Sequence, residues 1–168
     1  ADAIATFVQP KNVALFEKYG IFTEAEMRSR SEIMLDNYCK TLHIEALTMI
    51  DMTKKSILPS VLEYQGMLAD TAASKKMVNE YLSTELEEKL LDTISKLSTC
   101  LYSNLEALEG AVIKANDIAD VQEKANFYRE DVFAKMAALR GVADELELTV
   151  GEEYWAFPTY SDLLYSVK

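Results

Sequence analysis

The sequence predicts an all-α protein: an up-and-down bundle of long helices with a short N-terminal helix and an aromatic C-terminal tail. Apolar residues recur at steps of three and four over most of the 168 residues, and the alternation typical of strands is missing. Only five Gly and three Pro interrupt the chain. Long helices joined by short loops favour antiparallel neighbours, which is why we expect a bundle.

The first predicted helix is short and covers "PKNVALFEKY", residues 10–19. Pro10 suits the first helical turn, and Gly20 stands directly after the end of the segment. Val13 and Phe16 are its expected inner face. Residues 1–22 therefore form a lead-in and a short helix.

A long helix is predicted to begin at Thr23. Thr23 and Glu26 have the spacing of a capping box, in which each residue binds the backbone N–H of the other. Pro59 is expected either to kink this helix or to break and restart it, because proline lacks the N–H that a helix interior requires. The expected inner positions are Met27, Leu35, Tyr38, Leu42, Met49 and Ile57, followed by Val61, Leu62, Leu68 and Met77.

Two further long helices follow a turn at residues 79–83. Thr84 and Glu87 have the spacing of a second capping box, and the stripe after them is Leu86, Leu90, Ile94, Leu97, Leu101, Leu105, Leu108, Val112 and Ala115. The last long helix is expected to open near Asp117 or Asp120 and to end at Gly151. We interpret residues 1–168 as a single helical domain, with the long-helix bundle at 23–151 and a tail at 152–168.

Charge and composition exclude several functions. The net charge is −11 with no basic cluster, so the sequence predicts neither a nucleic-acid surface nor an anionic-membrane surface. No apolar run is long enough for a membrane span, and the N-terminus lacks the pattern of a secretory signal, so we expect a cytoplasmic protein. Cys39 and Cys100 are expected to be reduced thiols, although spacing alone leaves a disulfide possible. The chain starts at Ala1, which we interpret as a sign of a fragment.

No residues form a recognisable catalytic, cofactor-binding or metal site. The acidic side chains have the positions of helix starts and solvent-facing surfaces. Cys39 and His43 are one helical turn apart, but no third group is evident that would orient the imidazole or complete a metal site. The five glycines are isolated, so a phosphate-binding loop is not expected. The methionines of "ALTMIDMTKK" favour core or domain-interface packing, with an adaptable binding surface as the alternative.

The tail concentrates aromatic residues. Five of the chain's sixteen aromatics lie in the last fifteen residues: Tyr154, Trp155, Phe157, Tyr160 and Tyr165. Exposed together they would form an apolar patch, so we expect the tail to dock on a surface. The expected docking residues are Tyr154, Trp155, Phe157 and Tyr160. The expected target is the bundle near the short first helix, Ile21 and Phe22; a partner protein is the alternative.

Two segments resemble a known family. They are "NVALFEKYGIFTEAEMRSRSEIMLDNYCKTLHIEALTMIDMTKKSILP" and "EYWAFPTYSDLLYSV", and they resemble the C-terminal region of type III glutamine synthetases, a large bacterial form of the enzyme. The likeness covers nearly the whole chain. The middle helices are generic and would not identify the family alone.

The resemblance implies a parent enzyme of nitrogen metabolism that joins ammonia to glutamate with ATP and divalent metal ions, in a ring-shaped oligomer. The metal and nucleotide ligands of that family lie in an upstream catalytic domain, so no catalytic residue is transferred to this chain. We expect the chain alone to lack activity and to pack against the catalytic domain or neighbouring subunits. Two alternatives remain: a stand-alone helical interaction module, and a small helical enzyme that uses Cys39 and His43.

Overall fold

The structure is a computed structural model that describes residues 2–158 and 160–165, and every element in them is helical. The expected all-α helical bundle is confirmed. The chain divides into two compact units, Ala1–Thr48 with Ala107–Met136 and Met49–Glu106 with Ala137–Lys168. Each unit is described by itself below. That residues 1–168 behave as one domain stays a prediction.

The first unit holds the N-terminal helices. It contains α1 (Asp2–Phe7), α2 (Pro10–Lys18), most of α3 (Glu24–Met52), the end of α5 (Glu85–Asn116), α6 (Val121–Phe127), the π-helical turn η2 (Tyr128–Val132) and the start of α7 (Phe133–Glu147). Its buried apolar residues are Val13, Met27, Leu35, Cys39, Leu42, Ala46, Leu108, Ala111, Val112, Ala115, Ala125, Tyr128, Val132 and Met136. Helix α1 was not predicted; Asp2 at its start forms an ion pair with Arg129.

Three phenylalanines hold the N-terminal helices together. The ring centroids of Phe7 and Phe16 are 5.9 Å apart, and those of Phe16 and Phe22 are 5.8 Å apart. The Arg30 guanidinium lies 4.6 Å from the centre of the Phe22 ring. Docking of the tail near the short first helix, Ile21 and Phe22 stays a prediction. Gly20 has a φ of 62°, a left-handed conformation that glycine adopts without strain.

The second unit holds a long helical hairpin. It contains the end of α3, the π-helical turn η1 (Thr53–Ile57), α4 (Leu58–Val78), the first part of α5, the end of α7 and the C-terminal segment with α8 (Tyr160–Tyr165). Its buried apolar residues are Ile50, Ile57, Val61, Leu68, Ile94, Leu101, Leu105, Leu139, Leu146 and Val150.

Pro59 neither breaks the helix nor forces a restart, because a π-helical turn precedes it. The Leu58 N–H donates to the Thr53 carbonyl, five residues back, instead of to the carbonyl four residues back. In a regular α-helix the ring of Pro59 would clash with the carbonyl of residue 55. The wider turn changes the backbone hydrogen bonds of the helix at this place. The Thr53 hydroxyl donates to the Met49 carbonyl at 2.8 Å. The helical path therefore continues from Glu24 to Val78.

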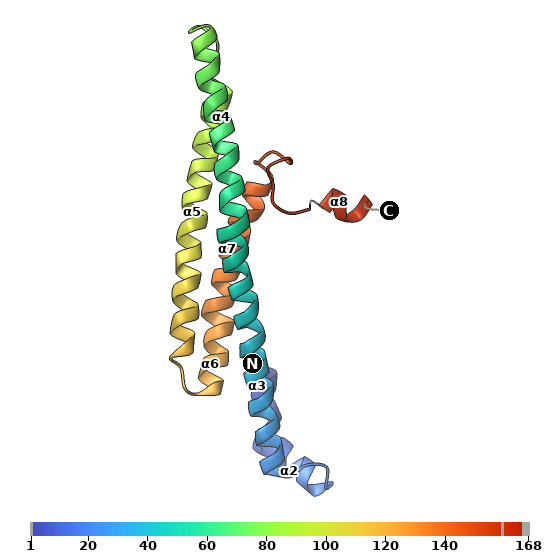
Figure 1. Cartoon of the computed structure of the whole chain (residues 1–168). Helices are drawn as coiled ribbons and strands as arrows, with labels where there is room; N and C mark the ends of the chain where they lie inside the picture. The colour runs from blue at the N-terminus through green and yellow to red at the C-terminus, as the bar shows by residue number, and fades with distance from the viewer. Residues whose placement is uncertain (1, 159, 166–168) are drawn as a thin grey trace. The chain divides into compact units, whose positions relative to one another are not determined.

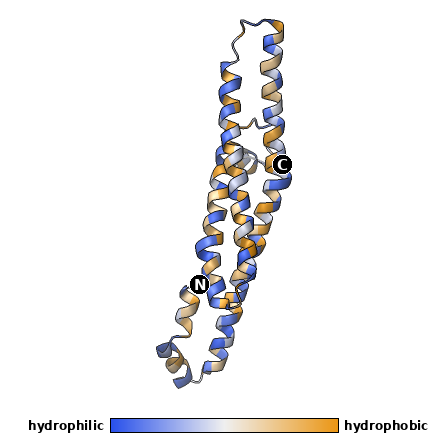
Figure 2. Ribbon diagram, turned by 90° about the vertical axis from the view of Figure 1, so that its left-hand side faces the viewer, coloured by the Kyte–Doolittle hydropathy of each residue, from blue (hydrophilic) through white to orange (hydrophobic). Residues whose placement is uncertain are grey.

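Three expected core positions of the α4–α5 hairpin are exposed in the structure: Met77 and Leu86 near its tip, and Leu62 near the start of α4. Leu62, Met77 and Leu86 are exposed by 61%, 87% and 66%. Figure 1 shows the hairpin continuing past the end of α7, so among the described residues no third helix lies beside its tip; this explains the exposure of Met77 and Leu86 but not that of Leu62. Apolar residues at this end appear orange in Figure 2. A periodic stripe predicts a buried face only as far as a third helix covers it.

Helix α7 ends at Glu147, before the predicted stop at Gly151. Residues 148–150 continue in turns, with the Val150 N–H donating to the Leu146 carbonyl at 2.8 Å. Among the described residues only Gly20 has a positive φ, so Gly151 does not act as a left-handed cap. Its role lies in packing, as shown below.

Candidate functional site

Thr23 and Glu26 form two reciprocal hydrogen bonds at the start of α3. The Thr23 N–H donates to Glu26 Oε2 at 2.8 Å, and the Glu26 N–H donates to Thr23 Oγ1 at 3.3 Å. The bond from the Thr23 backbone, followed by one that the Thr23 hydroxyl donates to Glu26 Oε2 at 2.9 Å, lowers the pKa of the Glu26 carboxyl below its ordinary value. Both side chains therefore serve the helix end.

The interactions at Thr84 differ from the expected capping box. The Thr84 hydroxyl donates to Glu88, whereas Glu87 forms an ion pair with Lys75 of α4. Glu87 is 6% exposed, and its Oε2 is buried without a hydrogen-bond partner in the described part of the chain. Glu87 therefore links the two helices of the hairpin, a role that local spacing did not reveal.

His43 and Tyr128 form the polar contact at the centre of the first unit. His43 Nδ1 lies 2.9 Å from the Tyr128 hydroxyl, and the rings meet edge to face. Tyr128 is 2% exposed, and burial raises the pKa of its phenol. The π-helical turn η2 begins at Tyr128, and the Phe133 N–H donates to its carbonyl. Because the two residues are 85 positions apart, local spacing in the sequence does not reveal this contact.

Cys39 lies in the same core but is not arranged as a nucleophile. Its side chain is buried, and burial raises the pKa of its thiol, so the unreactive protonated form is favoured. Nδ1 of His43 bonds to the Tyr128 hydroxyl and not to the Cys39 thiol. Cys100 is exposed. That both thiols are reduced stays a prediction.

The C-terminal segment docks on α4 through a close contact of two tyrosines. The Tyr64 and Tyr154 ring centroids are 5.3 Å apart. A Cβ added to Gly151 would lie 3.3 Å from Tyr64 Cε2 and 3.5 Å from Tyr154 Cδ2, so a methyl group there would press on the Tyr64 ring. Tyr154 thus packs on α4 of its own unit.

The next aromatics of the tail are only partly covered. Trp155 and Phe157 are half-buried and meet edge to face, with centroids 6.4 Å apart. Tyr160 starts the short helix α8, but its side chain lies outside the described residues. Docking of Trp155, Phe157 and Tyr160 as a functional strap stays a prediction.

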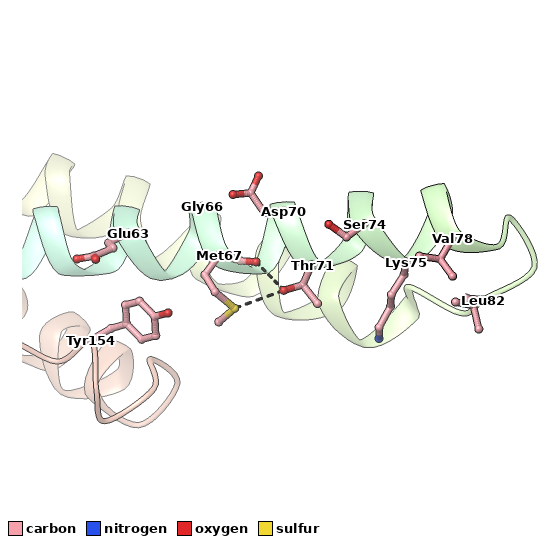
Figure 3. Close-up of a pocket in the computed structure, with 10 residues that line it drawn as sticks. All are labelled: Glu63, Gly66, Met67, Asp70, Thr71, Ser74, Lys75, Val78, Leu82 and Tyr154. Atoms are coloured by element: carbon pink, nitrogen blue, oxygen red, sulfur yellow. Dashed lines mark hydrogen bonds between the residues drawn. The ribbon is translucent and has the colours of Figure 1, made fainter.

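An open groove of about 770 Å³ runs along α4 beside Tyr154. Figure 3 shows Asp70 pointing away from Tyr154, while the Thr71 hydroxyl donates to the Met67 carbonyl at 2.8 Å. The polar groups of this groove do not converge on one point. The geometry is that of a surface depression rather than of a reaction centre.

Residues 2–158 and 160–165 contain no group of three or more His, Cys, Asp or Glu side chains placed to hold a metal ion. Within the same residues, no helix combines the length and apolarity needed to cross a membrane.

Comparisons with known proteins now define the class of the chain. A family model described as the glutamine synthetase C-terminal domain matches residues 1–76. A glutamine synthetase of Butyrivibrio fibrisolvens is 34% identical over 167 residues, which cover 99% of this chain and 24% of that protein. A type-3 glutamine synthetase of Dictyostelium discoideum is 25% identical and matches 98% of this chain and 23% of its own length.

The chain therefore belongs to the glutamine synthetase C-terminal domain family. The resemblance to type III enzymes noted in the sequence is confirmed by the match to a type-3 relative over almost the whole chain. The chain spans about a quarter of the length of the relatives it matches.

Proposed function

We propose that this chain is the non-catalytic C-terminal part of a type III glutamine synthetase and serves packing or subunit assembly. The parent enzyme would ligate ammonia to glutamate with ATP and divalent metal ions, in the cytoplasm of a bacterium. The observation that carries the proposal is the match to a glutamine synthetase over 99% of this chain but only 24% of that relative. Most of such an enzyme, including its reaction centre, would lie outside this chain.

The polar side chains of the chain support a structural role. Glu26 caps a helix, Glu87 pairs with Lys75 across the hairpin, and His43 bonds to the buried Tyr128. Each group is used by the fold, which leaves it poorly placed to act on a substrate.

The hairpin tip offers a surface for assembly. Met77, Val78 and Tyr81 are exposed by 87%, 83% and 86%. Lys76 Nζ donates to the carbonyls of Glu80 and Leu82 at 3.2 and 2.9 Å and so orders the loop between the helices. A cluster of apolar side chains on an ordered tip is typical of a protein contact.

A relative of known activity provides the test. The Butyrivibrio fibrisolvens enzyme would be prepared intact, without its matching C-terminal quarter, and as a chimera that carries this chain in its place. Glutamate-dependent phosphate release and sedimentation would report ligation and assembly. We expect truncation to change the assembly and the chimera to restore it, while the isolated chain releases no phosphate.

Two results would contradict the proposal. The first is glutamate-dependent phosphate release by the isolated chain, and the second is a truncated enzyme that assembles like the intact one. In the chimera, Met77→Ser with Tyr81→Ser should weaken assembly, whereas Phe133→Ser, at an exposed apolar residue outside the tip, should not. Circular dichroism would verify that all variants stay helical.

A further inference from the structure

A cavity of about 300 Å³ lies in the second unit between the end of α3, η1, α7 and the C-terminal segment. Its floor consists of Thr53, Ile57 and Leu139, which are exposed by 2%, 7% and 1%. This volume is at the lower end of the range for small-molecule sites. The cavity is thus large enough for one compact ligand.

Methionine and aromatic side chains form the walls of the cavity. Met49 and Met52 contribute thioethers on one side, and Trp155 and Phe157 contribute half-buried rings on the other. Methionine side chains adapt to ligands of different shape, and the faces of aromatic rings attract cations. The walls therefore favour an apolar body that carries a positive charge.

The rim of the cavity carries excess negative charge. Arg140, Asp144 and Glu147 line it from one face of α7, and Arg140 Nε lies 3.6 Å from Asp144 Oδ2. Glu147 is half-buried, and its side chain has no hydrogen-bond or ion-pair partner among the described residues. A carboxylate beside an apolar cavity gains a favourable partner when a cation reaches it.

We propose that this cavity binds a small organic cation with an apolar body, such as an arylalkylamine. The ammonium group lies at Glu147, and the apolar body lies between Met52, Trp155 and Leu139. This site is independent of the assembly role proposed above, because it uses no residue of the hairpin tip.

Trp155 is the only tryptophan of the chain and reports on the site directly. The 168-residue protein would be titrated with 4-phenylbutylamine, 4-phenylbutanol and 4-phenylbutyrate, with excitation of tryptophan alone. These ligands share one body and differ in head group. We expect saturable binding of the amine in the millimolar range or tighter, about five-fold tighter than the alcohol, and weakest binding of the acid.

Variants on α7 localise the site. Glu147→Gln should weaken binding of the amine about five-fold and leave that of the alcohol unchanged. Glu145→Gln is the matched control, because this exposed side chain is on the same helix but does not line the cavity. Ala143→Leu should weaken binding of all three ligands by filling the cavity.

The proposal is overturned by an absence of saturable binding or by equal affinity for the three head groups. It is also overturned if Glu147→Gln and Glu145→Gln have the same effect on the amine. Because the Gln variants keep the size of the side chain, they test the charge even if Ala143→Leu fails to fold.

Discussion

Tyr64 of α4 and Tyr154 of the C-terminal segment pack with their ring planes 51° apart, and Gly151 lies against both rings. The contact fastens the chain after α7 to a helix almost ninety residues earlier in the sequence. A Cβ at residue 151 would lie 3.3 Å from Tyr64 Cε2, closer than an ordinary van der Waals contact.

Gly151→Ala should therefore destabilise the protein, by about 1 kcal/mol, since the new methyl group would push on the Tyr64 ring. Gly66→Ala is the matched control: a Cβ at this position in α4 meets nothing within 4 Å, and alanine favours helix. We expect Gly66→Ala to stabilise by about 0.5 to 1 kcal/mol. Urea unfolding measures the free energy of unfolding of both variants. If Gly66→Ala destabilises the protein as much as Gly151→Ala, the contact with the Tyr64 ring is not the cause.

Tyr128→Phe should lower the free energy of unfolding by about 1 to 2 kcal/mol, because it removes the hydrogen bond to His43 and keeps the ring. The exposed Tyr81 provides the control, and Tyr81→Phe should have no effect. Chemical denaturation of the purified variants checks this. Equal stabilities would mean that the His43–Tyr128 bond contributes nothing net.

Cys100 should react with a thiol reagent quickly and Cys39 only on the timescale of unfolding. Cys39 is buried, and that burial raises the pKa of its thiol, so little thiolate is available. Timed labelling with a chromogenic disulfide should thus show two phases, and Cys100→Ser should remove the fast one. Rapid labelling of Cys39 in the folded protein would revive the hypothesis of a reactive cysteine beside His43.

Glu87→Gln should destabilise the protein at neutral pH, and the difference from the unaltered protein should disappear in acid. The hydrogen bond from Lys75 lowers the pKa of Glu87 from its ordinary 4.5. Its stabilising effect is therefore present above about pH 4.5 and is lost as the pH falls through the lowered value. Melting temperatures between pH 7 and pH 2 measure this, with Glu85→Gln, in an exposed pair with Lys89, as the neutral control. A difference that does not change with pH would contradict the ion-pair explanation.

Trp155→Ala should cost about 1 to 3 kcal/mol of folding free energy, because the indole is half-buried on its own unit. Tyr165→Ala should cost almost nothing, since Tyr165 is 81% exposed. Thermal unfolding compares the two. A freely quenched, red-shifted Trp155 emission would instead indicate that the tail docks on a partner.

The long helices could be predicted because each repeats one simple spacing for many turns, as Leu101, Leu105 and Leu108 do. Helix α1 could not, since six residues carry too little pattern. From the sequence, Pro59 indicated only that the helical hydrogen bonds near it had to differ from those of a regular α-helix. The form of the change depends on hydrogen bonds that the sequence does not display.

The candidate sites were harder to predict, because their contacts join distant parts of the chain. Glu87 was placed in a local cap by its spacing from Thr84, yet its partner is Lys75 on the opposite helix. The cavity unites Met49 and Met52 with Trp155, about a hundred residues later. The adaptable binding surface considered for these methionines stays a prediction.

The π-helical turn before Pro59 also affects which changes in chain length the protein tolerates. A turn closed over five residues holds one residue more than an α-helical turn. Deleting one residue between Thr53 and Ile57, with Pro59 replaced, would leave an ordinary helix whose later side chains keep their faces. The same deletion in the middle of α4 would rotate every following residue by about 100° and turn Leu68 out of the core. The turn is thus the place in this long helix where relatives can differ by one residue without repacking.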